Sequence, residues 1–193
     1  EQGIGDTLTW SSYLSHVTSQ AKHCILECQE KLIPLLERSF PNVEVKAVNK
    51  SLDLERNDFD FHLPMGSLYK HFINEIEQNT KINAHLIPDP LRVNFWKERL
   101  NSLGSGPYIG ICWKSSNIST IRMPNYATIS ELYPVLKLPN VTYVNLQYTD
   151  FANDLAKIKK EIGVKIHNFD DLDHFNNIDD VAALCAALDI VVS

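Results

Sequence analysis

The sequence lacks the features that define several protein classes, and each absence excludes one of them. No apolar run approaches the roughly 20 residues that span a bilayer, and the first residues lack the basic and apolar regions of a secretory signal. Basic residues are outnumbered, with 18 Lys and Arg against 24 Asp and Glu. A general nucleic-acid binder needs a basic surface to displace counterions. We therefore expect a cytoplasmic protein with no membrane span and no nucleic-acid partner.

Metal and disulfide patterns are also missing. The four cysteines, Cys24, Cys28, Cys112 and Cys185, lie in apolar stretches without the paired spacing of a zinc site or the density of a disulfide scaffold. The histidines form no HExxH pattern, and the acidic run at 170–180 does not match a calcium loop. We expect buried free thiols, an acidic run that forms a solvated turn with helix caps, and no metal or cofactor.

Apolar and turn-forming residues alternate along the chain in a regular way. Strands are expected at 23–28, 43–48, 58–64, 108–113, 141–147, 164–169 and 189–193, and helices at 8–17, 30–40, 65–76, 88–103, 129–136, 151–163 and 178–188. This alternation predicts an α/β fold with parallel strands that helices cover on both faces.

The GSGP segment at 104–107 interrupts this pattern and predicts two domains, 1–103 and 107–193. We also expect that the first strand and the C-terminal part of the second domain are missing, so that the chain is a segment of a longer protein. The apolar residues at 190–192 would then be uncovered and would favour self-association.

The turn Gly3-Ile4-Gly5-Asp6 is the sharpest local signal. Two glycines let the backbone approach a ligand, and a helix start supplies free N–H groups. Asp6 is either a reactive carboxylate or simply the cap of a helix that begins at Thr7. Leu8 occupies the third glycine position of the dinucleotide fingerprint, so a nicotinamide site has little support.

A second cluster of polar residues follows the expected strand at 108–113. Lys114, Ser115 and Ser116 lie at its carboxyl end, and Arg122 comes a few residues later. Ligands of open α/β sheets bind at such strand ends. Lys114 and Arg122 suit a diphosphate, the arginine as a fork and the lysine as a point charge. The alternative is a pair of solvated surface cations.

Several segments together resemble one family. They are EQGIGDTLTWSSYL, HCILECQEKLIPLL, DFDFHLPMGSL, YIGICWKSS, VTYVNLQ and DDVAALCAALDIVVS. In this order they resemble the heptosyltransferase-like glycosyltransferase domain that follows tetratricopeptide repeats in many bacterial proteins. The resemblance implies the type B glycosyltransferase fold, in which two Rossmann-like domains face each other across a cleft. It also implies transfer of a sugar from a nucleotide-sugar donor to a hydroxyl of a saccharide or protein acceptor, without a metal.

The same resemblance implies roles for individual residues. Asp6 matches the general base. The acceptor side would include Gly3, Gly5, His62, Gly66 and Ser67, and the donor side Lys114, Ser115, Ser116, Arg122 and Gln147. A non-catalytic sugar- or nucleotide-binding module is the alternative function. A sugar-nucleotide epimerase is disfavoured by the incomplete glycine fingerprint.

Overall fold

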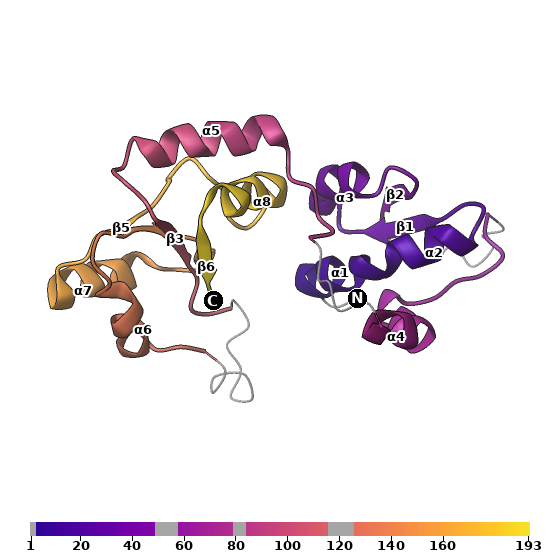
Figure 1. The fold of residues 1–193 in the computed structure, drawn as a ribbon, viewed down its shortest axis with the longest axis horizontal. Coiled ribbons are helices and arrows are strands. Elements are labelled where there is room, and N and C mark those ends of the chain that lie inside the picture. The colour runs from indigo at the N-terminus through magenta and orange to yellow at the C-terminus, as the bar shows by residue number, and fades with distance from the viewer. Residues whose placement is uncertain (1–2, 49–57, 79–83, 116–125) are drawn as a thin grey trace. The chain divides into compact units, whose positions relative to one another are not determined.

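The chain forms two compact α/β units. The structure, a computed structural model, describes residues 3–48, 58–78, 84–115 and 126–193. The units comprise Glu1–Ile87 and Pro88–Ser193, and the strands of each pair in parallel (Figure 1). The α/β class with parallel strands is therefore confirmed.

The boundary between the units differs from the one expected at 104–107. It precedes helix α5 (Pro90–Asn101), which we had assigned to the first domain. Two α5 side chains, Trp96 and Leu100, are almost completely buried in the core of the second unit. Packing decides which unit a helix joins, and the GSGP segment is only the short connection from α5 to the next strand.

The first unit is built around two parallel strands. Helix α3 covers them by burying Leu35 and Leu36, while the strands bury Leu26, Cys28 and Val45. The elements are α1 (Ile4–Trp10), α2 (Leu14–Gln20), β1 (Ile25–Cys28), α3 (Ile33–Ser39), β2 (Glu44–Ala47) and α4 (Leu68–Gln78).

The strand expected at 58–64 is not formed, and that prediction is wrong. These residues are irregular and exposed. Phe59, Phe61 and Leu63 alternate as a half-buried strand would, yet Phe61 is 91% exposed. A period of two predicts a strand only where a neighbouring strand and a core are present to receive it.

The second unit has three layers. Its sheet has the order β5-β4-β3-β6, with all neighbours parallel. Helices α5 and α8 cover one face and helices α6 and α7 the other (Figure 1). The elements are β3 (Tyr108–Ile111), α6 (Ile129–Leu136), β4 (Thr142–Asn145), α7 (Ala152–Ile162), β5 (Ile166–His167), α8 (Ile178–Ala187) and β6 (Ile190–Val192).

Alternation along the strands produces these two cores. Val144 and Leu146 face α5 and α8, whereas Ile109, Ile111 and Tyr143 face α6 and α7. The packing on the first face is so close that the central strand needs a glycine. A Cβ atom at Gly110 would lie 2.5 Å from a methyl carbon of Leu146. This contact fixes the distance between β3 and the chain beyond β4.

The strand order places β6 on the opposite side of β3 from β4. The chain first adds strands in one direction, from β3 to β5, and then returns to add β6 beside β3. As the edge strand, β6 leaves Ile190 52% and Val191 45% exposed. Within the described ranges, no helix is long and apolar enough to cross a membrane.

Candidate functional site

Polar side chains gather where the strands of the second sheet end. Because β3, β4 and β5 are parallel, the segments that follow them meet at one edge of the sheet. Lys114 and Ser115 follow β3, Gln147 and Tyr148 follow β4, and Asn168 follows β5. The sequence predicted the first two and Gln147 as donor-binding residues.

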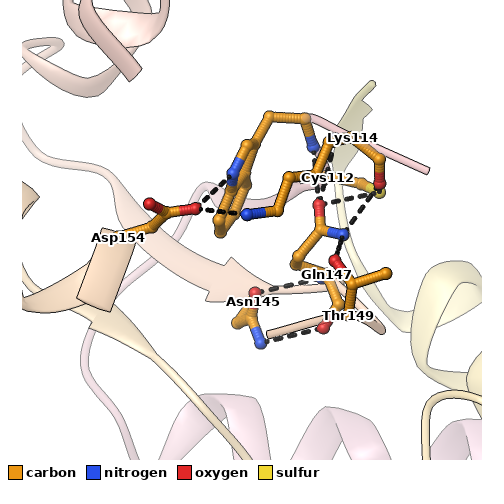
Figure 2. Close-up of polar contacts among 7 residues, drawn as sticks. Cys112, Lys114, Asn145, Gln147, Thr149 and Asp154 are labelled. Atoms are coloured by element: carbon orange, nitrogen blue, oxygen red, sulfur yellow. Dashed lines mark hydrogen bonds and ion pairs between the residues drawn. The ribbon is translucent and has the colours of Figure 1, made fainter. Parts of the chain in front are cut away.

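Gln147 supports the backbone at this edge. It is completely buried, and its Oε1 accepts hydrogen bonds from the backbone N–H groups of Trp113 and Lys114, both at 3.1 Å. Its Nε2 donates to the carbonyl oxygen of Lys114 at 2.8 Å and to Thr149 Oγ1 at 2.6 Å (Figure 2). The amide predicted to contact the donor is therefore used to hold the segment after β3 against β4.

Lys114 is held in an ion pair. Its Nζ donates to Asp154 Oδ2 at 2.8 Å, and both side chains are 26% exposed. The same oxygen accepts from the indole Nε1 of Trp113 at 3.0 Å. Lys114 is therefore not the fully solvated surface cation of the alternative interpretation. It is a half-buried cation turned toward α7 (Figure 2).

A row of buried amides continues from Gln147 toward β5. Asn145 is completely buried. Its Nδ2 donates to Asn168 Oδ1 at 2.8 Å, and its Oδ1 accepts from the backbone N–H of Gln147 at 3.0 Å. Asn168 in turn donates to Asp170 Oδ1 at 2.5 Å. We did not select Asn145, although two amides on one face of an apolar strand, at 145 and 147, are a readable signal.

Beside this row lies a pocket of about 240 Å³. Its lining combines aromatic rings, including Tyr148 and Phe175, with the polar groups of Asn168 and Asp170. The rings of Tyr148 and Phe175 are 6.3 Å apart. The Tyr148 hydroxyl donates to Ser115 Oγ at 3.1 Å, so the pocket adjoins the segment that follows β3.

The predicted acceptor-side residues lie in the first unit. Helix α1 begins at Ile4 with Gly3 as its N-cap, and no side chain caps it. Both the predicted start at Thr7 and the alternative role of Asp6 as its cap are therefore wrong. Asp6 lies exposed in the first turn.

Other acceptor-side residues are only partly brought together. Gly66 and Ser67 belong to a single turn of 3₁₀ helix, Met65–Ser67, which packs against α1. His62 lies in the exposed irregular segment before that turn, with its ring 6.0 Å from the ring of Phe59. On the donor side, Ser116 and Arg122 lie outside the described residues.

The acidic run at 170–180 is more structural than predicted. Asp173 stabilises a turn by accepting from the backbone N–H groups of residues 175 and 176, as expected. Asp180, however, is buried and forms a two-bond ion pair with Arg92, and it also accepts from Trp96 Nε1 at 2.7 Å. In the described part of the chain, no three His, Cys, Asp or Glu side chains are grouped as a metal site.

Comparison with known proteins finds a relative of the chain. Protein FlbA of Caulobacter vibrioides is 35% identical to the chain over an alignment of 207 positions. The alignment takes in the whole chain but only 35% of FlbA, so the chain spans about a third of that relative. No protein-family model matches the chain, and no solved structure matches it.

Proposed function

We propose that the chain is part of a glycosyltransferase that moves a sugar from a nucleotide-sugar donor to an acceptor hydroxyl. The second unit would be a Rossmann-like donor domain. The order β5-β4-β3-β6 supports this proposal, because the direction of strand addition reverses between β3 and β6. Open α/β sheets bind ligands outside the carboxyl ends of the strands at such a point. Lys114 and Ser115 lie in the segment that follows β3, three and four residues beyond its end at Ile111.

The chemistry of the edge fits the two parts of a nucleoside diphosphate. Lys114 supplies positive charge for the phosphates. The pocket beside the amide row has aromatic faces for a base and, at Asn168 and Asp170, oxygen atoms that could accept from ribose hydroxyls. Tyr148 connects the two regions through its bond to Ser115. A single nucleoside diphosphate lying along this edge would contact both Lys114 and the aromatic pocket.

The proposed reaction needs a base on the acceptor side. As the acceptor oxygen attacks the anomeric carbon, its proton passes to Asp6, and the nucleoside diphosphate leaves with the electrons of the broken bond. The surface beside Asp6 is open to an acceptor, since a Cβ at Gly5 would have no neighbour within 4 Å and one at Gly3 would meet only Asp6 Oδ2, at 4.0 Å. A general base contributes about 10²–10⁴-fold to a rate.

One observation favours the second candidate, a non-catalytic nucleotide- or sugar-binding module. Lys114 is already neutralised by Asp154, and Gln147 has its amide bonded to the backbone. Neither group is immediately available to stabilise a leaving diphosphate. A binding module, however, has no need of a carboxylate at position 6, so Asp6 distinguishes the two functions.

The decisive experiment replaces Asp6 by asparagine in the protein that contains this chain. We expect Asp6→Asn to lower sugar transfer by about 10²–10⁴-fold and to leave the affinity for uridine, guanosine or adenosine diphosphate unchanged in calorimetry. Asp60→Asn is the matched control, because Asp60 is another exposed carboxylate of the first unit. Transfer that survives Asp6→Asn would exclude the general base, and the absence of any transfer in the unsubstituted protein would favour the binding module.

A further inference from the structure

The contact between Lys114 and Asp154 has a property that the proposed function does not explain. The Lys114 Nζ and the Trp113 Nε1 both donate to one oxygen, Asp154 Oδ2, at 2.8 and 3.0 Å. Two donors from adjacent residues therefore hold this carboxylate, which projects from the first turn of α7. The ammonium group is directed at a fixed anion of the protein (Figure 2).

Burial makes this pair stronger than an ordinary surface pair. Trp113 is 5% exposed and belongs to the core between the sheet and helices α6 and α7. Its indole nitrogen bonds to Asp154, and the side chains of Lys114 and Asp154 are each only 26% exposed. Screening by water and salt is weaker at such a site than at a fully exposed one. In the structure, the charge at the carboxyl end of β3 is locally balanced.

We propose that Asp154 is a built-in competitor of the anionic ligand and sets the affinity of the Lys114 site. A phosphate group gains the full charge of Lys114 only when the ammonium turns away from Asp154. The apparent dissociation constant is then the intrinsic one divided by the fraction of molecules in which Lys114 is unpaired. This inference rests on the proposed function, since it assigns Lys114 to an anionic ligand.

The first test is Asp154→Asn in the purified chain, with inorganic pyrophosphate as the probe. Asparagine keeps an oxygen that accepts from Trp113 Nε1 but removes the charge that holds Lys114. We expect pyrophosphate to bind about twofold to fivefold more tightly, the range that corresponds to an ion pair worth up to about 1 kcal/mol. Glu98→Gln is the control, because it makes the same charge change at an exposed position of α5, which covers the opposite face of the sheet. It should leave the affinity unchanged.

The second test asks whether the gain depends on Lys114. In a Lys114→Met background, Asp154→Asn should no longer tighten binding. The indole N–H signal of Trp113 gives an independent readout, because only three tryptophans contribute to that region of the NMR spectrum and Trp113→Phe assigns the signal. Pyrophosphate should shift it in the unsubstituted chain, as the Asp154 oxygen loses one of its two donors, and should not shift it in Lys114→Met.

The outcomes separate this inference from the proposed function. Unchanged or weaker pyrophosphate binding by Asp154→Asn, or no binding by any variant at about 10 mM, would overturn the role of Asp154 as a competitor. An equal gain in the Lys114→Met background would also overturn it, since the carboxylate would then act only by long-range repulsion. Tighter pyrophosphate binding together with no affinity for any nucleoside diphosphate would support the inference and contradict the nucleotide-sugar donor.

Discussion

Replacement of Asp180 by alanine should destabilise the second unit strongly. Asp180 accepts from Arg92 Nε at 2.8 Å, from Arg92 Nη2 at 2.6 Å and from Trp96 Nε1 at 2.7 Å. Its side chain is 10% exposed. These three bonds connect α8 to α5 across one face of the sheet.

The magnitude follows from what the substitution leaves behind. Trp96 is 1% exposed, so its indole N–H would stay buried without an acceptor, at a cost of about 1–3 kcal/mol. Arg92 is 40% exposed and water can solvate it, so the loss of its ion pair with Asp180 adds roughly 1 kcal/mol. We expect a total of about 2–4 kcal/mol, which lowers the melting temperature of a unit of this size by about 10–20 °C.

A control with the same chemistry joins α5 to the turn that precedes α8. Asp171 forms a two-bond ion pair with Arg99 at 2.6 and 2.9 Å, but its side chain is 63% exposed. Asp171→Ala should therefore cost less than about 1 kcal/mol. Urea unfolding of both variants, followed by tryptophan fluorescence and repeated calorimetrically, measures the difference. Equal losses of stability in the two variants would refute the argument from burial.

Three further predictions concern the second sheet. Gln147→Leu should lower the free energy of unfolding by about 2–4 kcal/mol in urea titrations, because the backbone groups of Trp113 and Lys114 lose their hydrogen-bond partners. A loss of ligand affinity without a loss of stability would instead show that Gln147 contacts the ligand directly. Gly110→Ala should cost about 1–3 kcal/mol through overpacking, whereas Gly5→Ala on exposed α1 should be neutral or stabilising in the same thermal assay. Burial and the charge of Lys165 hold the pKa of His167 below its usual value of about 6.5. As the pH falls below about 6.5, His167 is therefore protonated in the unfolded chain before it is protonated in the folded one, and the free energy of unfolding should decrease. Thermal melts at different pH values should show this decrease, and His167→Gln should remove it.

Local sequence patterns were sufficient for most of the elements. The helix expected at 129–136 has these bounds in the structure, where Thr128 and Glu131 form a capping box at its start. The segment at 58–64 shows the limit of this reasoning, since its alternation is as regular as that of a true strand. Whether such a segment pairs depends on residues that are distant in the sequence, and no local pattern contains that information.

The sequence predicted which residues lie at the carboxyl edge of the second sheet, but not the contacts that they make. The rule that ligands bind at the carboxyl ends of parallel strands selected Lys114 and Ser115 correctly as residues of that edge. The partner of Lys114 lies 40 residues further along the chain. The role of Gln147 depends on the register that sets Ile111 opposite Asn145. The partner of Lys114 and the role of Gln147 both depend on how the strands pair, and no short motif in the sequence encodes that pairing.

The amide of Gln147 also couples two segments mechanically. The ladder between β3 and β4 ends at Ile111 and Asn145, with one more bond from the N–H of Leu146 to the carbonyl of Ile111. Beyond that point the side-chain amide takes the place of a peptide group, with one oxygen that accepts and one nitrogen that donates. The segments that follow β3 and β4 can therefore diverge at the edge of the sheet and stay connected through the Gln147 side chain. A force applied to Lys114 is transmitted through this side chain directly to β4, without passing through the turns that lie between them in the sequence.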